Sequence, residues 1–348
     1  MKRLLVFRFS AMGDVAMTVP VLYALVKQYP DLQITIVSRE AFRPFFEKLP
    51  ANISFIAADL YGKHKGIRGL YRLFRELSPS KFDAVADLHD VLRTFFLRFC
   101  FRLTGIPVEH INKGRKEKKA LTRQQNKKCI ALTPTCERYA NVFRKLGLSF
   151  PLEFTTIYET EQPDRSTFIQ HTGEKGDFRW VGIAPFAKHV GKMYPLSKME
   201  EVIVELSRQE KIKLFLFGGG KEEIETLAAW EKKYPNTTAL AGKLKLNGEL
   251  ALISQLDVMI SMDSANMHMA SLTNTPVVSI WGATHPWGGF LGWNQSAANI
   301  IQTDLPCRPC SIFGHKPCIR QDYACLNRIT PQSIISHTLK VLNSTASH

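Results

Sequence analysis

The feature that most constrains the fold is a repeated alternation between short apolar runs and helical stretches. An apolar run at 3–9 leads through an amphipathic stretch at 14–28 to a second apolar run at 32–38. Continuous apolar runs of this length are typical of strands buried on both faces, as in a parallel sheet with helices on both sides. The sequence therefore predicts an α/β fold built on doubly wound parallel sheets.

The alternation stops once and then restarts. Residues 158–178 are polar, contain Pro and Gly and show little periodicity, which is typical of a linker. A second series of apolar runs begins with WVGIAPFA at 180–187. Because 348 residues are enough for about two domains of ordinary size, we predict one Rossmann-like domain at 1–157 and another at 179–348, with a central cleft between them.

Further runs complete both predicted domains. We expect more strands at 53–59, 82–88, 212–220, 238–242, 256–262 and 276–282. We expect helices at 66–77, 91–104, 196–209, 221–233, 247–254 and 265–273. The helix at 91–104 is strongly apolar, which favours a place in the core, with contact to lipid as the alternative.

Polar or glycine-containing segments follow predicted strands five times. These segments are FSAMGDV, APFAKHVGKMYP, FGGGKEE, SMDSANMH and WGATHP. Ligands of doubly wound sheets bind at the carboxyl ends of strands, where loops meet helix N-termini. In the first segment, Asp14 stands where a strand is followed by a helix, with Arg8 as the one charged residue near it. This carboxylate can cap the helix or act as a general base, and the residues alone leave both interpretations open.

Three segments of the second predicted domain suit a phosphate-bearing ligand. In SMDSANMH, a helix N-terminus can bind phosphate with help from the Ser264 hydroxyl, and a simple helix cap is the alternative. Lys188 and Lys192 lie on a glycine-containing loop and suit a diphosphate, with a solvated basic loop as the alternative. In FGGGKEE, Glu222 or Glu223 can accept hydrogen bonds from a ribose, or can simply suit the helix dipole.

The charge balance favours a polyanionic partner. The chain has 46 Lys and Arg against 31 Asp and Glu, a formal net charge of +15. The stretch at 113–128 contains eight basic residues and a single Glu, and a solvated loop is its alternative interpretation. No aromatic residue interrupts this stretch, so it lacks the stacking platforms of single-strand binders, and we expect no nucleic-acid partner.

Four of the seven cysteines cluster near the end of the chain, at 307, 310, 318 and 325. The sequence has no apolar run long enough to span a membrane, and charge and Gly come too early for a signal peptide. We therefore expect a cytoplasmic protein, in which disulfides are rare. The cluster then indicates either a metal site or buried thiols.

Signature motifs of other α/β classes are absent from the sequence. No G-x-G-x-x-G follows the first predicted strand, and no G-x-x-x-x-G-K-[ST] occurs. The prediction of a Rossmann oxidoreductase or a P-loop NTPase loses its support. The nucleophile-elbow motif G-x-S-x-G is also missing, which argues against an α/β-hydrolase.

Taken in chain order, the segments resemble the family 9 glycosyltransferases, the bacterial heptosyltransferases of lipopolysaccharide core assembly. The likeness lies in LLVFRFSAMGDVAMTVPVLYAL, APFAKHVGKMYP, AGKLKLNGELALI, MDSANMHMASLTNTPVVSIWGATHP and the cysteine-bearing tail, and it runs from residue 3 to about 331. It implies a GT-B architecture: two Rossmann-like domains facing a central cleft, the acceptor on the first and the nucleotide sugar on the second. It also implies inverting transfer from an ADP-activated heptose, with no cofactor and no essential metal.

The resemblance also implies a role for each matching residue. Asp14 would be the catalytic base, and Gly13 would leave room for a substrate beside it. Ala265 stands where the family usually has Gly, which bears on the choice of donor. The implied donor-binding residues are Lys188 and Lys192 at the diphosphate, Glu222 or Glu223 at the ribose, Leu244 near the adenine, and Asp263, Ser264, Ala265 and His268 around the diphosphate and the sugar.

The implied acceptor is lipid A carrying Kdo units, an anionic glycolipid of the inner membrane. The basic stretch would face it from the N-terminal domain, since each Lys near an anionic surface is worth about 1 kcal/mol. We therefore expect a heptosyltransferase peripherally bound to the membrane, with a non-catalytic nucleotide or anionic-surface binding protein as the alternative. The implied acceptor-binding residues are Gly13, Lys113, Arg115, Lys116, Lys118, Lys119 and Arg123.

Overall fold

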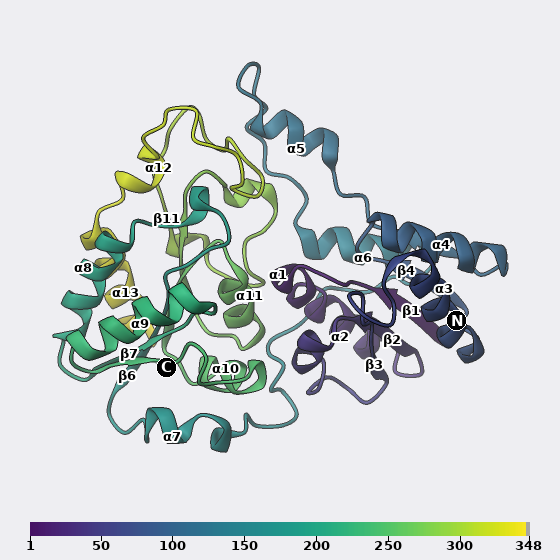
Figure 1. Ribbon diagram of the computed structural model, residues 1–348, viewed down its shortest axis with the longest axis horizontal. Helices are drawn as coiled ribbons and strands as arrows, with labels where there is room; N and C mark the ends of the chain where they lie inside the picture. Colours follow the sequence, from purple (N-terminus) through teal and green to yellow (C-terminus); the bar gives the residue numbers. More distant parts are fainter. Residues whose placement is uncertain (346–348) are drawn as a thin grey trace. The chain divides into compact units, whose positions relative to one another are not determined.

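The computed structural model describes residues 1–345, and the chain divides into two compact units (Figure 1). The first unit comprises Met1–Arg115 and Thr133–Glu161. The second comprises Lys116–Leu132 and all described residues from Gln162 onward. Each unit has its own parallel sheet and its own helices, so the predicted α/β class is confirmed.

The first unit is built on five parallel strands in the order β3-β2-β1-β4-β5. These are β1 Arg3–Phe7, β2 Gln33–Ser38, β3 Ile53–Ala57, β4 Ala84–Asp87 and β5 Val108–His110. Its helices are α1 Met12–Ala16, α2 Val19–Gln28, η1 Glu40–Phe45, α3 Gly66–Leu77, η2 Ser78–Ser80, α4 Leu92–Leu103 and α6 Thr135–Lys145. The central strand β1 is fully buried from Leu4 to Phe7, as expected for a strand with neighbours on both edges and helices over the sheet.

The second unit is built on six parallel strands in the order β11-β10-β9-β6-β7-β8. These are β6 Arg179–Ala184, β7 Ile212–Leu216, β8 Thr237–Ala239, β9 Val258–Met262, β10 Val277–Trp281 and β11 Ile300–Gln302. The helices of this part of the chain are α5 Arg115–Thr122, η3 Arg165–Thr167, α7 Ile169–Thr172, η4 Val190–Lys192, α8 Leu196–Ser207, α9 Lys221–Lys233, α10 Leu246–Ile253, α11 Ala265–Leu272, η5 Pro286–Gly288, η6 Ala297–Asn299, α12 Ala324–Asn327 and α13 Pro331–Thr345.

Each sheet reverses its winding direction at one point. In the first sheet this point lies between β1 and β4, and in the second it lies between β6 and β9. Loops leave these two strands in opposite directions along the sheet, which opens a crevice at the carboxyl ends of the strands. The topology therefore predicts one ligand-binding edge in each unit, and most of the candidate residues fall there.

The helix predicted at 14–28 is two helices, α1 and α2. The Thr18 hydroxyl donates a hydrogen bond to the Val15 carbonyl at 2.7 Å, at the point where α1 ends. The second helix then begins with Pro20 in its first turn, where the missing N–H costs nothing. Asp14 therefore belongs to a separate short helix directly after β1.

The segment predicted as a linker, 158–178, is partly folded. It contains η3 and α7, and Phe168 between them is fully buried. Gly248 of α10 lies so close that a Cβ there would be 3.3 Å from the Thr167 carbonyl oxygen. This packing explains why the chain groups with the second unit from Gln162 onward.

The segment Lys116–Leu132 also groups with the second unit. The ammonium of Lys127 donates to the Cys307 carbonyl at 2.7 Å, and the Leu132 N–H donates to the Trp287 carbonyl at 2.8 Å. These contacts hold the segment on the second unit. In the described part of the chain, every helix is too short or too polar to cross a bilayer.

Candidate functional site

Asp14 is the third residue of α1, directly after β1. Its Oδ2 accepts a hydrogen bond from the Ala11 N–H at 3.3 Å and forms an ion pair with Arg8 at 2.7 Å. Arg8 is buried, and its other terminal nitrogen donates to the Leu88 carbonyl at 2.7 Å. Asp14 therefore does cap its helix, and a buried arginine that reaches across to the end of β4 also fixes its orientation.

Tyr139 of α6 contacts the same turn and the Arg8 guanidinium. Its hydroxyl donates to the Asp14 carbonyl at 3.2 Å, and its ring centroid lies 5.7 Å from the Arg8 guanidinium carbon. Burial raises the pKa of the Tyr139 phenol, so the hydroxyl stays a donor. Tyr139, 125 positions away in the sequence, thus helps to position Asp14 together with the nearby Arg8.

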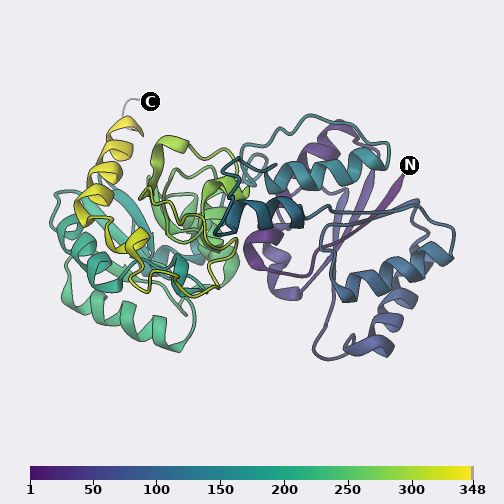
Figure 2. The ribbon, with the colours of Figure 1, turned by 90° about the horizontal axis from the view of Figure 1, so that it is seen from above.

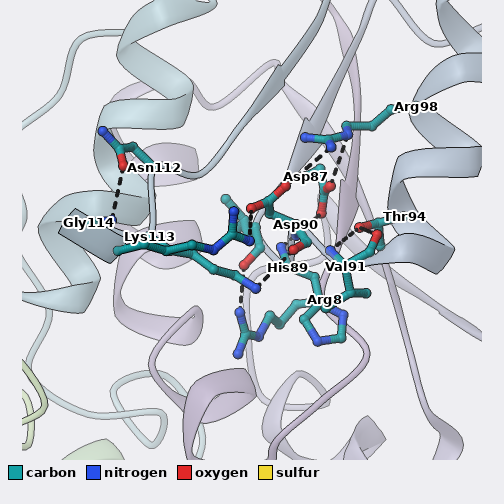
Figure 3. A network of polar contacts seen from close by, with 12 residues as sticks. Arg8, Asp87, His89, Asp90, Val91, Thr94, Arg98, Asn112, Lys113 and Gly114 are labelled. Carbon is teal, nitrogen blue, oxygen red and sulfur yellow. Dashed lines mark hydrogen bonds and ion pairs between the residues drawn. The ribbon is translucent and has the colours of Figure 1, made fainter. Parts of the chain in front are cut away.

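His89 follows β4 on the same edge of the sheet. Its Nε2 lies 3.4 Å from the Ser10 hydroxyl oxygen. Burial, together with the positive charges of Arg8 and Lys113, lowers the pKa of His89 to about 3. Figure 3 shows the side chains of Arg8, His89 and Lys113 close to the loop that follows β4. The imidazole is therefore neutral at physiological pH.

The lowered pKa of His89 predicts a pH dependence of stability. Below about pH 6.5 the unfolded chain binds a proton at this histidine, whereas the folded chain does so only near pH 3, so stability falls as pH falls through this window. We expect His89→Gln to reduce that slope by up to about 1.4 kcal/mol per pH unit. Urea unfolding at several pH values between 7 and 4 measures it.

The matched control for this prediction is His315→Gln, because His315 is exposed. The control should leave the slope as it is in the wild type. An unchanged slope in His89→Gln would contradict the assignment of a buried neutral imidazole.

Asp90, next to His89, contacts three basic side chains (Figure 3). Its carboxylate pairs with Arg98 at 3.2 Å and with Arg115 at 2.8 Å, and its carbonyl accepts a hydrogen bond from Lys113 at 2.9 Å. Burial lowers the pKa of the Lys113 ammonium. The predicted acceptor contacts Lys113 and Arg115 therefore lie at the edge that also holds Asp14.

The other basic residues predicted to bind the acceptor have their contacts in the second unit. They belong to the segment Lys116–Leu132, which groups with the second unit and not with the first, where the basic stretch was expected; their role at the acceptor stays a prediction. The physical reason is local docking: the Lys118 ammonium, for example, sits 4.7 Å from the ring centroid of Phe290. The residues concerned are Lys116, Lys118, Lys119 and Arg123.

Lys192 and Asp263 meet at the edge of the second sheet. The Lys192 ammonium lies 2.8 Å from Oδ2 of Asp263 and donates to its carbonyl at 3.0 Å. Asp263 is only 3% exposed and directly follows β9, whereas Lys192 is on the loop after β6. The pair therefore spans the point where this sheet reverses its winding, and it joins two residues that the sequence predicted independently.

The N-terminus of α11 adjoins this pair. Ser264 precedes the helix, and its hydroxyl lies 3.2 Å from the Ser261 hydroxyl. Ala265 is the first helical residue, and His268 is buried within the helix. The arrangement presents the free N–H groups of an eight-residue helix next to a lysine, which is favourable for phosphate.

Close backbone packing holds the Lys192 loop in place. The Ala283 N–H after β10 donates to the Gly191 carbonyl at 2.7 Å. A Cβ on Gly191 would lie 2.7 Å from the Gly314 carbonyl oxygen, which only glycine avoids. A Cβ on Gly314 would in turn lie 2.6 Å from Cγ of Lys192. The cysteine-bearing tail is therefore part of the wall around Lys192, which the sequence did not indicate.

The two acidic candidates beside the glycine loop after β7 differ in their contacts. Oε2 of Glu223 accepts a hydrogen bond from the Gly219 N–H at 2.7 Å, whereas Glu222 is exposed at the start of α9. Glu223 thus closes the loop, and Glu222 keeps its carboxylate in solvent. Leu244 is half-buried and Lys188 is exposed, each on a loop after a strand of this sheet.

The four late cysteines line one small cavity, next to Arg308 and Tyr323. Burial raises the pKa of the thiols of Cys310 and Cys325, the latter to about 11. Within residues 1–345, no three or more His, Cys, Asp or Glu side chains are arranged to hold a metal ion. Cys325 is buried, and Cys307, Cys310 and Cys318 are half-buried.

Three residues of this edge, His89, Asp90 and Tyr139, were not predicted from the sequence. The first two were detectable, because the predicted strand at 82–88 is followed directly by His and Asp, in the position of the other candidate segments. Tyr139 carried no signal, since α6 was not predicted and its contact with Asp14 depends on tertiary packing.

The sequence and the fold are similar to those of known proteins. The model of glycosyltransferase family 9 (heptosyltransferase) matches residues 70–323. Lipopolysaccharide heptosyltransferase 3 of Escherichia coli is 26% identical over 299 residues, which cover 83% of this chain and 85% of that protein.

Two solved structures share the fold at low identity. A family 9 glycosyltransferase from Veillonella parvula superposes with a TM-score of 0.74 at 20% identity, covering 99% of this chain and 98% of that one. ADP-heptose lipopolysaccharide heptosyltransferase II of Escherichia coli gives 0.73 at 18% identity, covering 99% and 100%. The predicted GT-B fold class is thereby confirmed, and the chain belongs to glycosyltransferase family 9, the heptosyltransferase family.

Proposed function

We propose that the protein is an inverting glycosyltransferase that moves a heptose from ADP-heptose onto the lipid A–Kdo core of lipopolysaccharide. The observation that carries the proposal is the Arg8–Asp14 ion pair at the carboxyl end of β1. It holds a part-exposed carboxylate in a fixed direction, as a general base requires. The family and the heptosyltransferase relatives support the choice of reaction.

Asp14 would act on the acceptor. The described contacts of its side chain engage Oδ2, and we assign Oδ1 to the acceptor hydroxyl. As the carboxylate takes the hydroxyl proton, the acceptor oxygen forms a bond to the anomeric carbon of the donor. The bond from that carbon to the diphosphate oxygen breaks, ADP leaves with the electron pair, and the configuration inverts.

Lys192 and the N-terminus of α11 would stabilise the leaving ADP. Negative charge grows on the diphosphate as the bond breaks, and a fixed ammonium beside free helix N–H groups is stabilising there. We propose that this set suffices and that no metal or other cofactor takes part. Asp263 orients the lysine, and Glu222 is the acidic side chain exposed to accept hydrogen bonds from a ribose.

The remaining residues fit the same proposal. Lys113 and Arg115, at the Asp14 edge, would contact the anionic acceptor. Because this acceptor is a glycolipid, we propose that the protein works at the cytoplasmic surface of the inner membrane as a peripheral enzyme. Donor residues outside the central pair would be Lys188, Leu244, Ser264, Ala265 and His268.

A direct test uses ADP-heptose and lipid A–Kdo. We expect ADP-heptose to raise the melting temperature by a few degrees at a concentration of 100 Kd, where ligand binding adds about 2.7 kcal/mol of stability. UDP- and GDP-sugars should give no comparable shift. Mass spectrometry of the glycolipid should then show one added heptose. Stabilisation by ADP-heptose without transfer would contradict the enzymatic function and favour a non-catalytic binding protein.

A further inference from the structure

One face of α4 is apolar and exposed. Leu92, Phe95, Phe99 and Leu103 are 88%, 57%, 54% and 72% exposed, and their spacing of three and four residues places them in one stripe along the helix. The opposite side, with Leu97 as an example, is buried in the core of the first unit. The helix predicted at 91–104 is therefore a core helix on one side only.

The neighbouring helix α3 also exposes large apolar side chains. Ile67 and Tyr71 are 70% and 48% exposed. The two helices pack together through Phe74 and Phe101, whose ring centroids are 4.9 Å apart, and Tyr71 lies beside Phe74. Figure 2 shows the two helices side by side in the first unit. We call the exposed side chains of Ile67, Tyr71, Leu92, Phe95, Phe99 and Leu103 the α3–α4 face.

Positive charge borders the α3–α4 face. α3 exposes Arg68, Arg72 and Arg75 in one stripe next to its apolar one, and α4 exposes Arg93 and Arg102. The sequence of α4 contains no acidic residue. The single acidic residue of α3 is Glu76, and it is paired with Lys63 at 2.8 Å. The surface therefore combines large apolar side chains with uncompensated guanidinium groups.

We propose that the α3–α4 face docks on an anionic lipid bilayer. Phe and Leu side chains on a helix lying in the interface insert among the acyl chains, while arginines reach the headgroup phosphates. A second copy of the chain fits this surface poorly, because a two-fold contact would bring the same arginines together. The inference rests on the proposed function, since docking brings the enzyme to a lipid-anchored acceptor.

The α3–α4 face also replaces the basic stretch as the membrane contact. That stretch has no large apolar cluster in its helix, and most of it is docked on the second unit. Physiological salt screens electrostatic attraction, so charge alone would hold the protein only weakly on a membrane. An apolar face with a cationic border gives both attraction and insertion.

The test is co-sedimentation with large unilamellar vesicles of phosphatidylethanolamine and phosphatidylglycerol (3:1) at 150 mM NaCl. We expect Phe95→Ser/Phe99→Ser to lower the partition coefficient at least tenfold, because two inserted rings are lost. Arg68→Gln/Arg72→Gln should lower it by about thirtyfold on these vesicles, and pure phosphatidylcholine should bind the wild type much more weakly.

Matched controls make the same kind of change, apolar to Ser or basic to Gln, elsewhere on the surface. Ile130→Ser/Phe178→Ser removes two exposed apolar side chains from the second unit, and Lys232→Gln/Lys340→Gln removes two exposed charges there. Both should keep wild-type partition. Because the altered side chains are exposed, all variants should melt within a few degrees of the wild type, which circular dichroism checks.

The outcomes separate this proposal from the proposed function. Phe95→Ser/Phe99→Ser should keep its turnover on a de-acylated, water-soluble acceptor and lose it on an acceptor embedded in vesicles. The docking proposal would be overturned if Phe95→Ser/Phe99→Ser kept the wild-type partition coefficient, or if the apolar control lost as much. It would also be overturned if the wild type formed a dimer that this variant disrupts and did not bind vesicles. Wild-type protein that binds vesicles but transfers no sugar to either acceptor would overturn the function and leave the docking surface standing.

Discussion

Asp14→Asn is expected to lower turnover at least about 10²-fold, because an amide cannot take up the acceptor proton. The affinity for ADP should stay within about twofold, since the predicted nucleotide residues belong to the other unit. Asparagine keeps an oxygen for the Ala11 N–H, so the helix cap survives. Single-turnover assays at saturating donor, together with calorimetry of ADP binding, measure both quantities.

The control for Asp14→Asn is Asp164→Asn. Asp164 also caps a short helix, accepting a hydrogen bond from the Ser166 N–H at 3.0 Å, but it belongs to the second unit. This variant should turn over normally. Asp14→Asn is expected to melt a few degrees lower, because Arg8 loses its charged partner, so assays are run well below that temperature. Normal turnover in Asp14→Asn would remove the base from the proposal.

Lys192→Ala is expected to raise the Kd for ADP by a factor of about 10². Loss of a charge-assisted contact accounts for roughly tenfold or more. The variant also leaves the buried Asp263 carboxylate unpaired where the diphosphate is proposed to bind, which adds repulsion. Isothermal titration calorimetry with ADP measures the change.

Two further variants sharpen this test. Lys192→Ala/Asp263→Asn should recover part of the lost affinity, because the repulsive charge is gone. Lys233→Ala breaks another ion pair of the same unit, 2.8 Å from Glu200, and should leave the Kd within about twofold. An unchanged Kd in Lys192→Ala would place the diphosphate elsewhere.

Much of the fold could be predicted from local pattern. The helices predicted at 66–77 and 221–233 match α3 and α9 to the residue, because their periodicity and flanking residues are unambiguous. α5, α6 and α13 were missed, as were the short edge strands β5 and β11. Their sequences are polar or short, and packing against the rest of the unit decides their conformation.

The candidate site was predicted as positions on strand ends and not as contacts. The sequence places Lys192 and Asp263 on separate loops, seventy-one positions apart, and only the strand order shows that these loops are neighbours. Arg8 was noted beside Asp14 because it is close in sequence, whereas Tyr139 reaches the same turn from α6. For the helix at 91–104, the sequence could only offer a place in the core and contact with lipid as alternatives, because an apolar helix has the same pattern whether one face or both are covered.

The route of the chain limits how the protein can be divided or recombined. It passes from one unit to the other after Arg115, returns after Leu132 and passes again after Glu161. A cut in the linker alone would remove Lys116–Leu132 from the unit on which Lys127 anchors it, and would leave the cysteine tail without that cover. To exchange acceptor specificity, a chimaera between relatives therefore has to be joined at all three crossings. Each exchanged unit then keeps the segments that pack on it.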